Sequence, residues 1–133
     1  MGQPAAKQGD QITATDTHIV MVPSPGGPVP TPLPHPFVGI LNGALSTNVK
    51  IQNMAAATVG STADNVPPHI PTPPGTSFQN PPTNKGQIMK GSATVMINNK
   101  PAARNGDMAQ TCNDPTPMPV GTVVAVSTVL IGG

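Results

Sequence analysis

Valine and isoleucine recur with a period of two in two short stretches of this chain. In residues 49–61 (VKIQNMAAATVGS) and 95–107 (VMINNKPAARNGD), the two apolar residues stand two positions apart, and a polar pair follows. A period of two is typical of a half-buried strand. Asparagine and glycine tolerate the positive φ of a tight turn. The pattern therefore predicts short strands that end in turns.

The two stretches are copies of one unit. They align without a gap at a displacement of 46 residues and share Val, Ile, Asn, Ala-Ala and Gly in register. A third copy is split: PAAKQGD at residues 4–10 matches the second half of the unit, and the chain's last stretch (126–133) contains VLIGG, which matches the first half. An internal repeat of this kind indicates repeated structural units. We expect three equivalent units and two termini that lie close together.

A helix is the alternative for residues 44–59, which contain three consecutive alanines and neither Gly nor Pro. The repeat argues against it. The equivalent of Ala55 is Pro101, and a proline inside a helix costs about 3 kcal/mol. Strand and turn are therefore predicted for all three copies. The proline-rich segments 23–36 and 67–82 are predicted to be extended loops between copies, because proline is excluded from the middle of a sheet.

Composition adds that the core must be thin. Pro and Gly together make up 33 of 133 residues, and the only aromatic residues are two Phe. Apolar burial alone would give marginal stability, so a further staple is expected. A proline-rich disordered interaction segment remains an alternative. Disordered chains, however, have few apolar residues and high net charge, whereas here 36% of residues are hydrophobic and the net charge is +1.

The charge and hydropathy patterns also bear on partners and location. A net charge of +1 provides no electrostatic reason to expect nucleic acid or an anionic membrane as a partner. Residues 1–10 lack the apolar region of a secretory signal, so we expect synthesis in the cytoplasm without a signal peptide. No apolar run reaches 18 residues, so no membrane-spanning helix is expected.

A metal ion is the staple that the sequence favours. Cys112 is the only cysteine, which excludes an internal disulfide. His18 and His69 each lie nine residues after the last glycine of their copy, and Cys112 lies six residues after its own. His35, between the first two copies, is the fourth candidate. Three imidazoles and a thiolate form a closed tetrahedral site of the structural zinc type. The alternative is three exposed histidines and an inert buried cysteine.

Catalytic chemistry has less support in the sequence. The chain has no Glu, and its five Asp fall mainly in turn-like contexts, so Asp10 and Asp107 are predicted to cap turns. Arg104 is predicted to pair with Asp107. Glycine patterns that bind nucleotides are absent. Two enzyme alternatives remain: a Cys112 nucleophile with a histidine base, and a small zinc metalloenzyme with three ligands and a water.

The stretches PAARNGD (101–107) and PAAKQGD (4–10) resemble the motif that names the PAAR-repeat family, and STVLIGG (127–133) resembles its terminal strand. This resemblance implies an all-β fold: a small conical module of short strands and hairpins over residues 1–133, with pseudo-threefold repeats and a zinc-stabilised tip. It implies a structural protein, not an enzyme. The metal would be one Zn²⁺ per chain, with iron as a substitute, and the ligands carried over are His18, His35, His69 and Cys112.

The resemblance also implies a partner. As a monomer, the module would cap the trimeric VgrG-like spike of a contractile injection system, such as type VI secretion or a phage-tail-like particle, with one cap per trimer. It would sharpen the spike and contact the target membrane transiently during piercing. Effector cargo is a further candidate partner, and delivery out of the cell follows. The middle copy departs from the motif, since it lacks the Pro, the basic residue and the Asp.

Overall fold

The fold is all-β, as predicted. The computed structural model describes residues 2–133, and these contain strands, turns and loops but no helix. None of the described residues therefore belongs to a helix long and apolar enough to cross a membrane. The strands are β1 (Gln3–Pro4), β2 (Gln11–Val22), β3 (Val29–Gly43), β4 (Lys50–Ile51), β5 (Met54–Ala55), β6 (Thr62–Asn65), β7 (Ser77–Phe78), β8 (Lys85–Ile88), β9 (Met96–Ile97), β10 (Lys100–Pro101), β11 (Met108–Thr111), β12 (Met118–Val124) and β13 (Leu130–Ile131).

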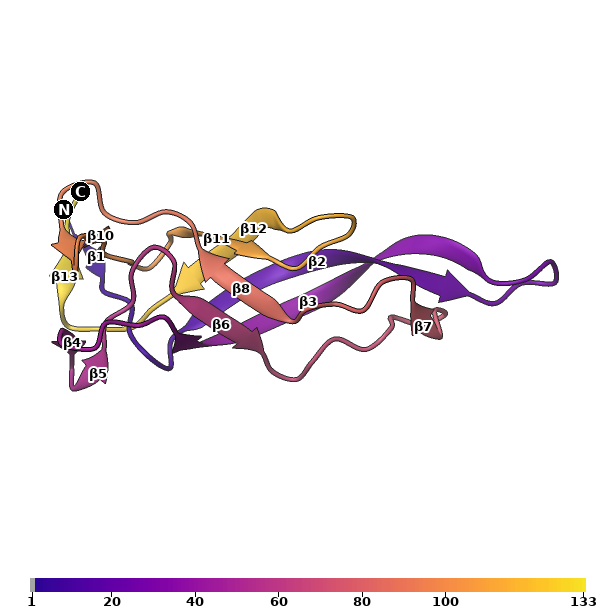
Figure 1. Ribbon diagram of the computed structural model, residues 1–133, viewed down its shortest axis with the longest axis horizontal. Helices are drawn as coiled ribbons and strands as arrows, with labels where there is room; N and C mark the ends of the chain where they lie inside the picture. The colour runs from indigo at the N-terminus through magenta and orange to yellow at the C-terminus, as the bar shows by residue number, and fades with distance from the viewer. Residues whose placement is uncertain (1) are drawn as a thin grey trace.

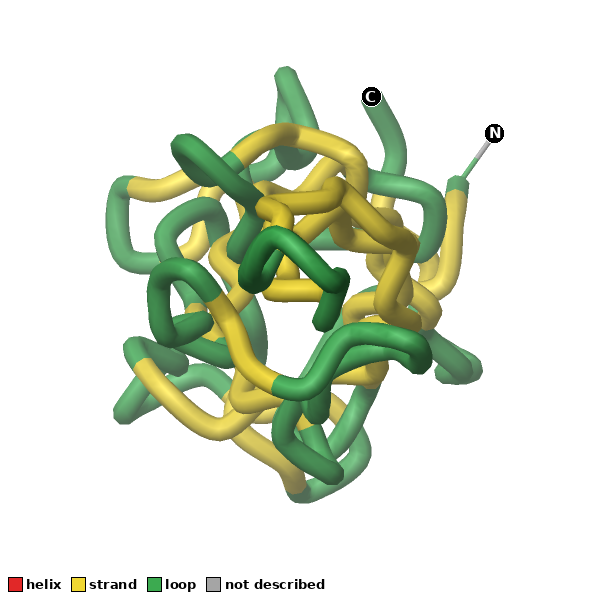
Figure 2. Tube along the Cα trace, turned by 90° about the vertical axis from the view of Figure 1, so that its right-hand side faces the viewer, coloured by secondary structure: helices red, strands yellow, loops and turns green. Residues whose placement is uncertain are grey.

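The molecule is elongated, with one wide and one narrow end (Figure 1). Both termini lie at the wide end, together with three pairs of two-residue strands: β1 with β13, β4 with β5, and β9 with β10. The long β2–β3 hairpin forms the narrow end. Figure 2 looks from the narrow end along the long axis, around which the strands and loops are arranged.

The three short strand pairs are the three predicted copies. β4 and β5 are joined by Gln52 and Asn53, with φ of 50° and 67°, and β9 and β10 by Asn98 and Asn99, with φ of 52° and 65°. Both turns therefore use the positive φ that the sequence predicted. In the split copy, β1 at one terminus pairs with β13 at the other. This pairing confirms that the two ends of the chain lie together.

The three copies meet in a closed ring of backbone hydrogen bonds. Ala6 N–H donates to the Ala103 carbonyl, Ala103 N–H to the Ala57 carbonyl, and Ala57 N–H to the Ala6 carbonyl, each at 3.0 Å. The three alanines are fully buried. A methyl group is the smallest side chain after that of glycine, so it lets three backbones approach one axis. The copies are thus related by a pseudo-threefold arrangement.

Each copy ends in a second turn that leads toward the narrow end. Its glycine has a φ between 88° and 97°, a conformation that glycine adopts without steric cost. These glycine N–H groups donate to carbonyls of the larger sheet at 2.8 to 3.0 Å, which joins the hairpins to it. The glycines are Gly9, Gly60 and Gly106.

A seven-stranded sheet forms the body of the molecule. Its order is β12-β11-β8-β6-β3-β2-β7, and β12 also pairs with β2, so six of its strands form a closed ring. The interior holds the larger buried side chains, which are Ile12, Phe37, Leu41, Ile88 and Val123. The core is therefore narrow, as the composition suggested.

One part of the loop prediction was wrong. Residues 29–36, expected to be loop, belong to β3 and pair with β2 along their whole length. Prolines occupy every second position from Pro30 to Pro36, so their nitrogens all face the edge away from β2. The Pro34 carbonyl, for example, accepts a hydrogen bond from Thr72 Oγ1 at 2.8 Å and not from β2. Since β6 pairs with β3 only from Gly39 to Gly43, the missing N–H groups cost no sheet hydrogen bonds.

The second proline-rich segment, 67–82, agrees better with the prediction. It is a loop apart from Ser77–Phe78, which forms β7 on the free edge of β2. The Gln79 N–H donates to the Ile19 carbonyl at 2.9 Å, and the Thr76 N–H to the Met21 carbonyl at 3.0 Å. This segment therefore covers the base of the projecting hairpin.

Candidate metal centre

Four side chains with metal-binding atoms converge midway along the molecule. Each of them offers one ligand atom, and these atoms all lie within 4.8 Å of one another. The group consists of Asp16 and His18 on β2, His69 in the segment after β6, and Cys112 directly after β11. Three of the four residues are buried, and Asp16 is fully so. A buried cluster of this composition can hold a metal ion.

The repeat explains how the chain assembles this group. The strands β2, β6 and β11 each begin just after the closing turn of one copy. All three run from the wide end toward the narrow end, and they alternate with β3, β8 and β12 around the closed ring (Figure 1). Each strand, or the residues that follow it, then contributes one of the three groups that the sequence singled out: His18, His69 and Cys112. The shared register of the copies thus becomes spatial proximity.

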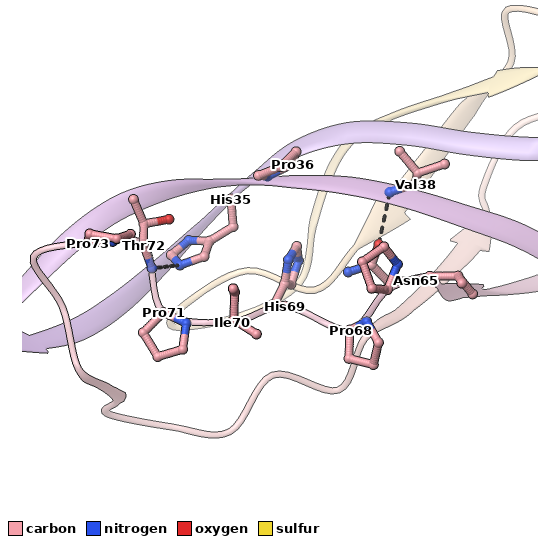
Figure 3. A pocket seen from close by; sticks show the side chains of 12 residues that line it. His35, Pro36, Val38, Asn65, Pro68, His69, Ile70, Pro71, Thr72 and Pro73 are labelled. Carbon is pink, nitrogen blue, oxygen red and sulfur yellow. Dashed lines mark hydrogen bonds between the residues drawn. The ribbon is translucent and has the colours of Figure 1, made fainter.

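The fourth predicted ligand, His35, lies beside the group. Its ring centroid is 5.4 Å from that of His18 and 5.5 Å from that of His69. Its Nδ1 atom lies 2.9 Å from the Leu33 carbonyl oxygen, and its Nε2 accepts a hydrogen bond from Thr72 N–H at 3.1 Å (Figure 3). His35 is therefore close to the site but outside the set of mutually close ligand atoms. Its coordination of the metal stays a prediction.

The observed spacing fits a tetrahedral metal ion. For Zn–S of about 2.3 Å and Zn–N of about 2.0–2.1 Å, two ligand atoms at the tetrahedral angle are about 3.6 Å apart. Cys112 Sγ and His18 Nε2 are separated by 3.6 Å. Imidazole and thiolate are also the donors that zinc prefers in structural sites. The residues present therefore suit such an ion.

Burial sets the protonation of the site. It lowers the pKa of His18, with a further contribution from His69, and it lowers the pKa of His35. Both rings are thereby held in the neutral form that binds metals. Burial, followed by the adjacent Asp16 carboxylate, raises the pKa of the Cys112 thiol to about 11. A thiol with this pKa is a poor nucleophile at neutral pH. A bound cation would instead favour the thiolate.

The two phenylalanines of the chain flank the histidines. The ring centroid of Phe78, from β7, lies 5.7 Å from that of His18 and 5.4 Å from that of His35. The ring of Phe37, from β3, lies 6.0 Å from that of His69. Apolar groups around a metal site limit access of water to it. The scarce aromatic residues are thus concentrated at the candidate centre.

A pocket of about 270 Å³ opens next to the site. Figure 3 shows His35 and His69 between β3 and the proline-rich segment 66–73, whose side chains line the pocket. The other lining residues from β3 are Pro36 and Val38. One side of the centre is therefore walled by an apolar, proline-rich loop.

Sequence reasoning missed Asp16, because it placed the aspartates mainly in turns. Asp16 lies in the middle of β2. The available signal was its position two residues before His18, since residues i and i+2 of a strand face the same side.

The prediction that aspartates cap turns was right for Asp10 and Asp107, whose carboxylates accept hydrogen bonds from the backbone N–H three residues earlier. The predicted pairing of Arg104 with Asp107 is confirmed, with Nη2 and Oδ1 2.9 Å apart.

Part of the chain matches a model of a known protein family. The family model described as PAAR motif matches residues 79–133, which include the copy at residues 95–107 and β13. A search of the curated proteins found no match for this chain. The matched segment supports a relation to the PAAR-type spike-tip family. With its all-β fold and its buried Asp-His-His-Cys group, the chain carries a PAAR motif at residues 79–133 and is consistent with a PAAR-repeat protein.

Proposed function

We propose that this protein caps a trimeric VgrG-like spike of a contractile injection system, with one cap per trimer. The observation that carries the proposal is the ring of three equal hydrogen bonds among Ala6, Ala57 and Ala103. A trimer ends in a threefold surface, and a single chain can match that surface only if its own is close to threefold. The PAAR motif supports the same partner.

The pseudo-threefold relation extends beyond the ring. Three isolated β-bridges connect the copies in a cycle: Ala5 with Arg104, Ala56 with Lys7, and Ala102 with Thr58. The three alanines occupy the same position of the repeat, and their partners, Lys7, Thr58 and Arg104, occupy the position two residues later. Three similar hairpins are therefore presented at the wide end, one for each subunit of a trimer.

The structure separates buried from exposed residues on these hairpins. The isoleucines at equivalent positions of the three copies are 5 to 8% exposed and form one buried cluster with Ala5, Ala56 and Ala102. They are Ile51, Ile97 and Ile131. One residue earlier in each copy the side chain is exposed, with Met96 at 57% and Leu130 at 61%, and Lys50 at the third position. We assign Met96 and Leu130 to the docking surface.

We propose one Zn²⁺ per chain in the candidate centre, with iron as a substitute metal. His18, His69 and Cys112 would hold it, with His35 as the fourth ligand. When bound, the ion supplies a cross-link between three segments that follow three different copies. Because the core is narrow, such a cross-link would stiffen the molecule against load along its long axis. The β2–β3 hairpin beyond it would then make the transient contact with the target membrane.

The proposed role also sets the location. The protein would be made in the cytoplasm, assembled at the tip of the injection particle and delivered out of the cell or into a target. Effector cargo remains a candidate partner. A structural role of this kind needs rigidity and a matched docking surface, and the Cys112 thiol, with its raised pKa, is poorly suited to attack a substrate.

Light scattering of the chain with a trimeric spike tests the proposal. We expect a monomer alone and one chain per trimer in the complex. Leu130→Glu should weaken the complex, because it places an unpaired charge in an apolar contact. Met118→Glu is the matched control, since Met118 is exposed on β12, outside the three hairpins. Three chains per trimer, or a chain that forms trimers by itself, would refute the symmetry argument.

A further inference from the structure

We infer that Asp16 is a positioning residue that orients His69, so that His69 donates its Nε2–H to Asp16 and presents Nδ1 to the metal. The inference rests on the proposed metal centre and goes beyond it, because neither the sequence motif nor the predicted ligand set assigns a role to this carboxylate.

Asp16 is a fully buried acid with several side-chain hydrogen-bond partners. Its Oδ1 accepts hydrogen bonds from the Thr111 hydroxyl and from Asn113 Nδ2, the latter at 3.4 Å. Its Oδ2 lies 2.9 Å from His69 Nε2 and 3.5 Å from Cys112 Sγ. None of its hydrogen-bond partners is a lysine or an arginine. One oxygen is therefore anchored, and the other is directed at the metal-binding side chains.

The distance to His69 distinguishes a hydrogen bond from shared coordination. Two N or O ligands of one tetrahedral zinc ion, at about 2.0–2.1 Å from it, lie about 3.3 Å apart. The observed 2.9 Å is shorter and equals the usual N–H···O length. A carboxylate accepts and does not donate, so Nε2 of His69 carries the hydrogen. Its lone pair for a metal is then on Nδ1.

His18 and His35 each direct the opposite nitrogen, Nδ1, at an oxygen atom, and Nε2 of His35 accepts the hydrogen bond from Thr72 N–H. His35 directs Nδ1 at the Leu33 carbonyl, 2.9 Å away. His18 directs its buried Nδ1 toward Asp114 Oδ2 at 3.5 Å, without forming a hydrogen bond, while its Nε2 faces Cys112 Sγ. Metal-bound histidines commonly hold their second nitrogen against a carboxylate or carbonyl oxygen. His69 is thus the one that must bind through Nδ1.

Long-range ¹H–¹⁵N NMR of the zinc-loaded, ¹⁵N-labelled chain tests the inference directly. We expect hydrogen on Nε2 of His69 and zinc on Nδ1. Zinc on Nε2 of His69 would overturn the role of Asp16, and so would X-ray absorption that places a carboxylate oxygen in the first shell. A chain that binds no metal would instead refute the proposed centre itself, so the two failures are distinguishable.

Substitution provides an independent readout. Asp16→Asn keeps an oxygen acceptor but removes its charge, so zinc affinity measured by chelator competition should fall about 10–100-fold, with His69 still bound through Nδ1. Thr111→Val removes only the hydroxyl that anchors Oδ1 and should cause a smaller loss. Asp64→Asn is the matched control, because this exposed carboxylate pairs with Lys85 and does not belong to the group of side chains at the centre. Equal affinities for Asp16→Asn and the control would contradict the inference.

Discussion

Replacement of Cys112 by serine separates the metal-binding role of this residue from its packing. Cys112 is 4% exposed, and its sulfur lies 3.6 Å from His18 Nε2, the separation expected for two ligands of one tetrahedral zinc ion. Binding free energies of structural zinc sites are about 10–16 kcal/mol for four ligands, or about 3 kcal/mol per ligand. Because a serine hydroxyl is a much weaker donor for zinc, the loaded chain should lose about that amount.

The chain without metal should respond differently. The serine hydroxyl can donate to Asp16 Oδ2, as the thiol does at 3.5 Å, and one such hydrogen bond contributes about 1 kcal/mol. The substitution should therefore change the stability of the metal-free chain by no more than about 1 kcal/mol. In a domain of this size, a loss of about 3 kcal/mol corresponds to a fall of about 10 °C in the thermal midpoint.

The assay is thermal unfolding followed by circular dichroism, for both chains, with zinc and with a chelator. We expect a large difference between wild type and Cys112→Ser in zinc, a small one in chelator, and only partial recovery when excess zinc is added. If the two differences are equal, Cys112 contributes packing alone and the reasoning is refuted. An unchanged midpoint in zinc would show that Cys112 is no ligand.

Three further predictions address the fold and the docking surface. Ala57→Leu should lower the free energy of unfolding, measured in urea, by about 1–3 kcal/mol, because the threefold ring has no room for a larger side chain. An effect near zero would contradict the close approach of the three backbones. Pro32→Val should restore an outward N–H on the unpaired edge of β3 and increase self-association in sedimentation velocity; a chain that stays monomeric at high concentration would argue against this role of the prolines. Docking to a trimeric spike should depend weakly on salt in a titration from 50 to 500 mM NaCl (about a tenfold range), because Met96 and Leu130, at two of the three equivalent exposed positions, are uncharged and only Lys50 carries a charge. A steep salt dependence would instead indicate a contact driven by charge.

Much of the fold follows from local sequence, because a repeated stretch must adopt a repeated conformation. The residue pairs after Ile51 and Ile97 accept positive φ, and the glycine that closes each copy does so as well. The pairing of β1 with β13 followed from the split of one copy between the termini. The same register placed His18, His69 and Cys112 at comparable distances from their copies. These inferences needed only the comparison of one stretch with another.

Other features depended on which strand edge is paired and on which side chains arrive from distant parts of the chain. The proline content of residues 29–36 predicted a loop. Because the prolines alternate and only the edge of β3 that faces β2 is paired in this stretch, these residues can form a strand. Asp16 acquires its role from Thr111 and His69, which lie 95 and 53 residues away in the sequence. Likewise, Ile97 is buried in a cluster that includes Ala5 and Ala56 of the other two copies, whereas its neighbour Met96 is exposed. Only the tertiary structure brings these partners together, since hydrogen bonds and burial depend on spatial neighbours that the local pattern does not specify.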